Sequence, residues 1–468
     1  MHSVTRIQVT DRIEGWHVYR TLFDLLLAEA NNEQASSSPN AAPSLYILPT
    51  WAFDILHEFV YQFQGFCQYR TQTAANAAKA SAGSGKSPSN HIMESLDVLS
   101  KNRDAWAVET VLFYLHRLIA AGTSSPSSTK AIAPAFRHLA IFASIALSRL
   151  ECLLGDYRAS LQAFSKLNKT SDSAEIVESV FAAKLSLAYH AGISYMMLRR
   201  YKDATKVLGD ICTTMQRGFK TGQLRKLAGS DQFTKLFDRM IALLAILTHV
   251  CPTAARLDDS LNRIIRDKHS SQLSKIEAGE EGYEEIFMFS CPKFISPALP
   301  DYASVSNPTA ATAEKDSNPS GTVTHAGQDA YRLQINQFKL EMSQQQSLRK
   351  LRSYMKLYTS IGVGKLAGFN DTAEDDFLAR LACCKHKMRQ LEITDASGSD
   401  GAAPIDSAAS NSDEEKAATA LDIHYYVVGD MVHVDGAQKQ RRFENYFMKG
   451  IKLNGEINKE VEQIDTTV

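Results

Sequence analysis

The chain has 468 residues, with 51 basic and 52 acidic side chains and a formal net charge of −1. This balance excludes binding to nucleic acid or membranes through overall charge, because such binding needs a strong field of one sign. The length suits two or three domains, or one elongated repeat body with an added domain.

Cysteine usage and the N-terminal residues predict an intracellular location. The seven cysteines are odd in number and mostly lie in apolar helical runs, which is typical of reduced thiols in an intracellular protein. Residues 1–16 are polar and charged and lack the apolar core of a signal peptide. The apolar run 23–28 is too short to span a bilayer. We therefore expect a cytoplasmic protein without membrane contact.

The first hundred residues predict helices separated by polar inserts. Residues 16–29 predict an amphipathic helix, and the Asn/Ser/Ala/Pro-rich residues 30–44 predict a loop. An aromatic-rich helix follows Pro49. Its apolar residues recur at helical spacing and are expected in the core: Phe53, Leu56, Val60 and Phe63.

Residues 71–90 are rich in Ala, Ser and Gly and predict a flexible linker. Within them, Gly85-Lys86-Ser87 imitates the end of a phosphate-binding loop. The first glycine of that motif would stand at Ala80, and no strand precedes it, so no nucleotide site is expected.

A helical repeat occupies the middle of the chain. Helices are predicted over 105–121 and 133–154. The stretch 153–164 aligns with 197–208 at an offset of 44 residues, which puts Tyr157 on Tyr201 just after a tight turn. Tetratricopeptide-like stacks also repeat a pair of helices joined by a tight turn, although their usual period is ~34 residues. Such helix pairs must stack, because one pair cannot bury its own apolar face.

The repeat ends in a change of pattern. Residues 233–250 predict the most apolar helix, ended by Pro252, and 257–277 predict a charged helix. The X-Pro steps in 280–300 predict an ordered, non-helical apolar crossing. The polar residues 301–328 are expected to be mobile.

A winged helix is predicted next. Residues 331–346 resume a helix that leads into 347–358, where Ile361-Gly362 interrupts it. Thr372 opens a third helix, with Asp375 in the position of a capping box. The expected buried face of this helix consists of Phe377, Leu378, Leu381, Cys384 and Met388.

A hairpin completes the winged-helix order. The acidic insert 394–418 is expected to be disordered. Two β-rich runs then flank Gly429-Asp430, a two-residue hairpin signal. Both faces of the hairpin carry apolar residues. Because the winged-helix core covers only one of them, the other face is expected to be exposed to solvent in a monomer.

The tail, residues 438–464, predicts a helix with an apolar stripe longer than a winged helix can cover. That stripe predicts a partner helix. It comprises Phe443, Phe447, Ile451, Asn454, Ile457, Val461 and Ile464.

Three long segments now carry a resemblance: FSCPKFISP (289–297), SYMKLYTSIGVGKLAGF (353–369) and DIHYYVVGDMVHV (422–434). In this order they resemble the family of subunit L of the eukaryotic translation initiation factor 3 complex. The resemblance implies a PCI domain, which is a helical repeat segment ending in a winged helix. It also implies a scaffold role in an assembly that binds the small ribosomal subunit and supports messenger RNA recruitment.

The expected neighbours are other PCI subunits, K and E among them, with C-terminal helices gathered into a bundle. The Ala/Ser-rich inserts 71–90, 301–328 and 394–418 depart from the family pattern. The resulting domain boundaries are 1–99 for N-terminal helices with flexible inserts, 100–300 for the helical repeat, 301–330 for a linker, 331–436 for the winged helix and 437–468 for the bundle helix.

No constellation predicts catalysis, a metal or a cofactor. Cys383-Cys384-x-His386 lacks a second ligand cluster with zinc spacing, and adjacent helical cysteines point about 100° apart. His424 and His433 flank the hairpin and suit a sheet pair better than a ligand site. No hydrolase, zinc-protease or dinucleotide motif occurs.

A winged helix can also bind nucleic acid, but the charges of this one do not favour that function. The start of the third helix, which would enter the major groove, carries Glu374, Asp375 and Asp376, and these would repel phosphate. The hairpin carries no Lys or Arg. The alternatives are a PCI subunit of another assembly, of the proteasome-lid or signalosome type, or a winged-helix nucleic-acid regulator.

Two residue sets follow. The predicted protein interface consists of Tyr426, Val428, Val432, Phe443, Phe447, Ile451, Ile457 and Val461. The basic residues that could touch ribosomal RNA are Arg349, Lys350, Arg352, Lys439, Arg441 and Arg442.

Overall fold

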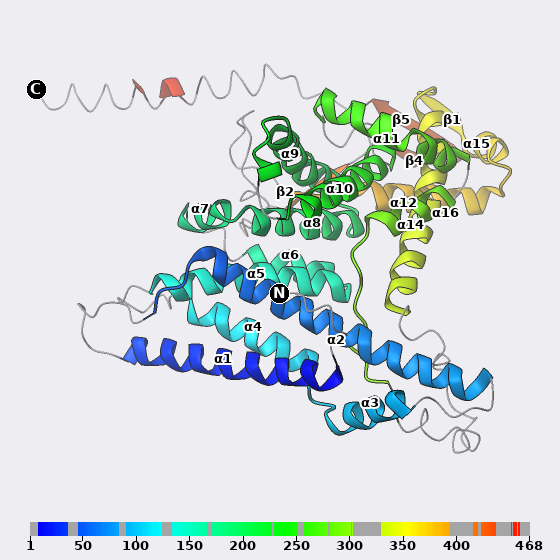
Figure 1. Cartoon of the computed structure of the whole chain (residues 1–468). Helices are drawn as coiled ribbons and strands as arrows, with labels where there is room; N and C mark the ends of the chain where they lie inside the picture. The colour runs from blue at the N-terminus through cyan, green and yellow to red at the C-terminus, as the bar shows by residue number, and fades with distance from the viewer. Residues whose placement is uncertain are drawn as a thin grey trace, which may run out of the picture. The chain divides into compact units, whose positions relative to one another are not determined.

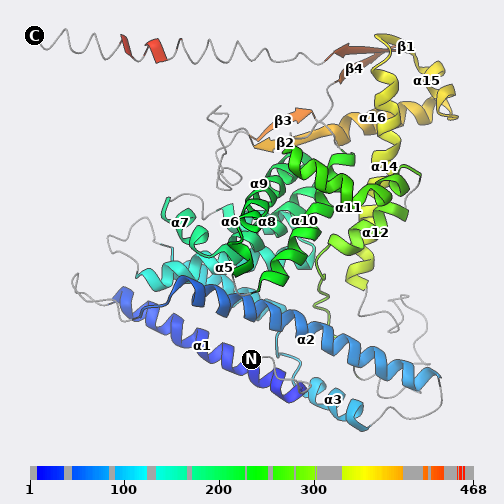
Figure 2. The same ribbon diagram turned by 45° about the horizontal axis from the view of Figure 1, so that its top comes forward.

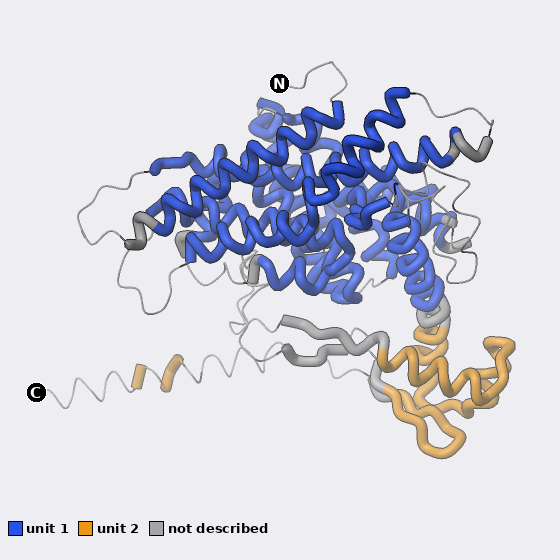
Figure 3. Tube along the Cα trace, turned by 90° about the horizontal axis from the view of Figure 1, so that it is seen from below, with its two compact units in different colours: residues 1–346, 390–418 blue, residues 347–389, 419–468 orange. Residues whose placement is uncertain are grey.

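The computed structural model (Figure 1) divides the chain into two compact units, residues 1–346 with 390–418, and residues 347–389 with 419–468 (Figure 3). The described residues are 8–35, 45–83, 90–123, 133–165, 171–226, 229–250, 257–278, 281–300, 302, 329–393, 415–419, 423–436, 451, 453–455 and 457–458.

The first unit is built almost entirely from helices, as predicted (Figures 1 and 2). The helices are α1 (Val9–Ala35), α2 (Pro49–Gly83), α3 (Asn90–Lys101), α4 (Val108–Ala121), α5 (Pro134–Leu154), α6 (Tyr157–Ser165), α7 (Ser171–Ser179), α8 (Phe181–Met197), α9 (Tyr201–Lys220), the short 3₁₀ helix η2 (Leu224–Lys226), α10 (Ser230–Val250), α11 (Asp259–Ala278) and α12 (Glu281–Ser290). The helix α14 (Asp329–Met355) is continuous, as the sequence predicted, and the strands β2 (Arg389–Ile393) and β3 (Glu415–Thr419) pair with each other.

The 44-residue offset corresponds to two equivalent turns. Tyr157 and Tyr201 are the first residues of α6 and α9, and both are buried. Two residues earlier in each copy the backbone is left-handed, with φ of 92° at Gly155 and 62° at Arg199. The first turn therefore has glycine, the residue that tolerates this conformation best, whereas the second turn has an arginine in the same conformation.

The core of the first unit follows the apolar pattern of the sequence. Residues 241–247 of α10 are fully buried, and the four apolar residues predicted for the face of α2 are buried as well. In the N-terminal helices, Trp16, Phe59 and Trp106 stack in one aromatic cluster, with Trp16 and Trp106 ring centroids 5.1 Å apart. Aromatic clusters of this kind supply much of a core's buried area.

Three of the predicted loops and linkers are wrong in part. The helix α1 continues to Ala35, so residues 30–35 are not a loop. The helix α2 continues to Gly83, so residues 71–83 are not a flexible linker. Alanine has the highest helix propensity, and Ala74 and Ala77 are fully buried. Gly85-Lys86-Ser87 lies outside the described residues, as do residues 303–328. The predicted disorder of 394–418 is contradicted at its end by β3, and residues 394–414 are outside the described ranges.

The crossing predicted over 280–300 is helical in its first half. α12 runs to Ser290, because the prolines that exclude helix come later, at 292, 297 and 300. Residues 291–300, here called the strap, have no regular secondary structure and bind to the helical body. Gln64 Nε2 donates to the Lys293 carbonyl (2.7 Å), and the Ile295 N–H donates to the Leu153 carbonyl (2.9 Å).

The second unit combines short helices with a three-stranded antiparallel sheet. It contains the end of α14, β1 (Ser360–Gly362), α15 (Val363–Phe369), α16 (Glu374–Met388), β4 (Ile423–Val428) and β5 (Met431–Gly436), and the strand order is β1-β5-β4. The hairpin is present, since Val428 pairs with Met431 around Gly429, whose φ is 57°.

Two details of α16 differ from the prediction. The helix begins at Glu374, and Thr372 Oγ1 is buried without a partner among the described residues, so Thr372 is not the capping residue. Leu378 is exposed, because it points about 100° away from its buried neighbour Phe377. Leu381 and Cys384 are buried as expected.

Candidate functional site

The hairpin of the second unit presents an edge strand. β5 lies between β1 and β4, so β4 has only one neighbour. The Val434 N–H donates to the Thr359 carbonyl (2.8 Å), on the side of β1. Tyr425, which is opposite Val434, therefore belongs to a non-hydrogen-bonded pair, and its own N–H and C=O face away from β5. By the two-residue period, the backbone groups of Val427 face the same way.

One position on this edge is already occupied. Lys385 of α16 donates from Nζ to the Tyr425 carbonyl (3.2 Å). A lysine at a sheet edge hinders the addition of another strand. Within the described part of the chain, no hydrogen bond is formed by the outward N–H and C=O of Val427. The open part of the edge is therefore short and lies next to the turn.

The two faces of the hairpin differ in burial. On the inner face the Tyr425 hydroxyl donates to the Leu381 carbonyl (2.6 Å), and Val432 packs into the core, 0% exposed. On the outer face, Tyr426 is 48% and Val428 is 59% exposed, and Met431 is also exposed. These three residues are here called the hairpin face. Tyr426 stacks on His433, with ring centroids 5.3 Å apart.

The predicted interface residues thus separate into three groups. Tyr426 and Val428 are exposed, and so are Ile451 and Ile457 of the tail. Val432 is corrected to a core residue, because β1 and β4 flank its strand and its side chain faces inward with that of Ile361. Phe443, Phe447 and Val461 lie outside the described residues. Met431, which sequence reasoning missed, could have been found as the residue that faces Val428 across the turn.

Of the six basic residues predicted to touch RNA, only Arg352 has a described side chain. Arg352 is half-buried and lies close to Cys384, where its charge acts to lower the pKa of that thiol. The side chains of Arg349 and Lys350 are outside the described set, and so are Lys439, Arg441 and Arg442.

Cys383 and Cys384 have different surroundings. Cys383 is exposed, whereas Cys384 is buried, and burial raises the pKa of the Cys384 thiol to about 11. A thiol with a raised pKa is a poor nucleophile. Among the described residues, no three His, Cys, Asp or Glu side chains gather as metal ligands.

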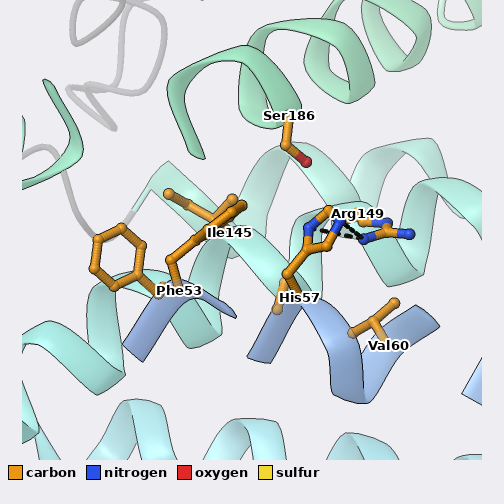
Figure 4. Close-up of a pocket in the computed structure, with 8 residues that line it drawn as sticks. Phe53, His57, Val60, Ile145, Arg149 and Ser186 are labelled. Carbon is orange, nitrogen blue, oxygen red and sulfur yellow. Dashed lines mark hydrogen bonds between the residues drawn. The ribbon is translucent and has the colours of Figure 1, made fainter. Parts of the chain in front are cut away.

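A small cavity lies between α2, α5 and α8 (Figure 4). Arg149 Nη1 lies 2.9 Å from Nδ1 and 3.0 Å from Nε2 of His57. Burial, with the charge of Arg149, lowers the pKa of His57 to about 3, so this histidine is neutral and can accept a hydrogen bond. The cavity encloses about 10 Å³, roughly the room of one water molecule, which is too small for a cofactor.

The chain is similar to known proteins over most of its length. A model of the family described as RNA polymerase I-associated factor PAF67 matches residues 11–453. The chain is 30% identical to "Eukaryotic translation initiation factor 3 subunit L" of Homo sapiens and of Bos taurus, over 97% of this chain and 72% of each relative. The protein of the same name from Nematostella vectensis is 29% identical over 95% of this chain and 76% of its own length. Of the helices described, none is long and apolar enough to cross a membrane.

Proposed function

Because the chain belongs to the family of subunit L of eukaryotic translation initiation factor 3, we propose that it is a non-catalytic scaffold subunit of that complex. The observation that carries the proposal is the similarity over 97% of the chain. The complex would act in the cytoplasm, bind the small ribosomal subunit and support messenger RNA recruitment. The neighbours of this chain there would be PCI subunits, including K and E.

The architecture that goes with this proposal is a PCI domain. The paired helices α5–α6 and α8–α9, with their equivalent turns, support a tetratricopeptide-like stack that ends near residue 300. The order of helix, short strand, two helices and hairpin supports a winged helix from about residue 331.

The scaffold role needs surfaces that other chains can cover. The hairpin face offers exposed apolar side chains next to the turn of β4 and β5, and Ile451 and Ile457 are exposed in the tail. Exposed apolar patches of this kind are typical of protein interfaces. The tail would join a bundle of C-terminal helices through the stripe that contains Phe447 and Ile451.

Covering the side chain of Tyr426 would itself strengthen binding to a partner. A tyrosine buries roughly 200 Å² when fully covered, and Tyr426 is 48% exposed, so a partner could cover about 100 Å² of it. At about 25 cal/mol per Å², this corresponds to about 2.5 kcal/mol, or roughly a 60-fold change in affinity.

Co-purification of a tagged chain tests the proposal. The wild type should bring down initiation factor 3 subunits. Replacing Tyr426 and Val428 by Asp should weaken that association, and so should replacing Phe447 and Ile451 by Asp. A matched control replaces Val18 and Leu25 of α1, which are also exposed, by Asp and should leave the association unchanged.

Two results would count against the proposal. Recovery of subunits of the proteasome lid or signalosome in place of initiation factor subunits would assign the chain to another assembly. Unchanged recovery with both the hairpin and the tail variants would remove these surfaces from the interface.

A further inference from the structure

The turn between α9 and α10 concentrates positive charge. Twenty residues separate Asp210 from Asp231, and they contain four basic side chains and no acidic one. The four are Arg217 and Lys220 in the last turn of α9, and Arg225 and Lys226 in η2, here called the basic turn. All four are exposed.

The basic turn has a fixed shape. η2 contacts both α9 and α10, which lie side by side (Figures 1 and 2). Leu224 of η2 is buried directly against Gly218 of α9, where a Cβ atom would lie 2.7 Å from Leu224 Cγ. Phe219 of α9 packs edge-on against Phe237 of α10, with ring centroids 5.7 Å apart. The backbone segments that carry the four cations are therefore held together by packing.

Two acidic side chains of the neighbouring segments already have other partners. Asp238 of α10 pairs with Lys268 (2.6 Å). Asp258 accepts hydrogen bonds from the hydroxyl and the N–H of Ser260. Across the described part of the chain, none of the four basic side chains forms an ion pair within 4 Å.

Helix stabilisation accounts for only half of the cluster. A cation in the last turn of a helix is stabilised by the helix dipole, which explains Arg217 and Lys220. Arg225 and Lys226 lie beyond α9 and precede the positive N-terminus of α10, where a cation gains nothing from a dipole. The helix dipoles therefore do not account for Arg225 and Lys226.

We propose that the basic turn is a binding site for the phosphate backbone of single-stranded RNA. Protein interfaces have an apolar centre, but no large apolar side chain is exposed between Leu198 and Met288 in the described ranges. A cluster of exposed cations suits a polyanion, whose binding is driven by counterion release. The choice of RNA as the polyanion rests on the proposed function, whereas the binding of a polyanion does not.

Fluorescence anisotropy of the full-length chain with a labelled oligouridylate tests this site. Four phosphate contacts predict a slope of about −2.8 in log affinity against log salt, so a fourfold rise in salt should weaken binding roughly 50-fold. Replacing the four residues of the basic turn by Gln should reduce the slope to near zero. The matched control replaces Arg158, Lys356, Lys365 and Arg380 by Gln, which removes the same charge from exposed positions elsewhere and should keep the slope.

The outcomes are distinct. Equal loss of the slope in both variants would overturn the proposal in favour of overall charge, and no salt-dependent binding by the wild type would overturn it outright. Tighter binding of an oligoglutamate of equal length would replace RNA by an acidic protein segment. The basic-turn variant should still co-purify with initiation factor subunits, so failure of the scaffold proposal is detected separately.

Discussion

The pair α8 and α9 meets at Gly192, where the two helices approach too closely for a side chain. A Cβ atom on Gly192 would lie 2.6 Å from both Cγ and Cδ2 of Leu208, which is fully buried in α9. We expect Gly192→Ala to push these helices apart. Overpacking of a core costs about 1–3 kcal/mol, and this overlap belongs at the upper end. Alanine has a higher helix propensity than glycine, which offsets about 1 kcal/mol of this cost. The net destabilisation is then about 2 kcal/mol.

Gly65→Ala in α2 is the matched control. A Cβ atom there would meet only Arg12 Nη1, at 3.6 Å, which is an ordinary contact. The same substitution should therefore stabilise the protein by up to about 1 kcal/mol. Urea unfolding followed by the helical circular dichroism signal measures both changes.

A double-mutant cycle identifies the cause. Leu208→Ala alone should cost about 2–5 kcal/mol by leaving a cavity. Combined with Gly192→Ala, the added methyl group enters that space, so the double variant should be about 1–3 kcal/mol more stable than the sum of the single changes predicts. Additive effects, or the same sign for Gly192→Ala and Gly65→Ala, would refute the steric account.

Three further predictions concern titration, hydrogen bonding and thiol reactivity. Burial lowers the pKa of both His57 and His190 to about 3, below the unfolded value of 6.5, so the stability that they confer is complete above about pH 6.5 and is lost as the pH falls towards 3. Urea unfolding at about pH 5 should show a loss of about 2 kcal/mol per histidine relative to pH 7, and His57→Gln should halve this loss. Tyr425→Phe should destabilise the second unit by about 1 kcal/mol, because it removes the hydroxyl that donates to the Leu381 carbonyl in addition to the helical hydrogen bond. The change should appear as faster hydrogen exchange in α16, and unchanged exchange would contradict this. Among the six described cysteines, maleimide should label Cys383 in the native protein and the other five only after unfolding, a pattern that peptide mass spectrometry would reveal.

Local patterns predicted the helical elements well. The apolar run of α10 and the continuous α14 lie where helical spacing indicated them. The equivalent turns at Tyr157 and Tyr201 were visible because an aromatic residue recurs there after 44 residues. The helical extension of α2 was missed because an Ala/Ser/Gly-rich composition fits a linker as well as a packed helix, and only tertiary contact with Ala74 and Ala77 decides between them.

The candidate interface was predictable in part for a related reason. Strand alternation separates Tyr426 and Val428 from Tyr425, and the structure has this difference in burial. The burial of Val432 depends on β1, a three-residue strand whose pairing with β5 no local pattern indicates. The basic turn is visible in the sequence as a run without acidic residues, but its rigidity depends on the packing of Leu224 against Gly218.

The strap has a consequence for synthesis of the chain. Gln64 and Arg70 donate to the carbonyls of Lys293 and Pro297, which are 229 and 227 residues later in the sequence. At about 5–20 residues per second, the acceptors emerge about 10–45 seconds after their donors. Arg70, only 2% exposed in the finished protein, must remain hydrated during that interval. The contacts that complete the packing of α2 against the strap therefore form late in synthesis.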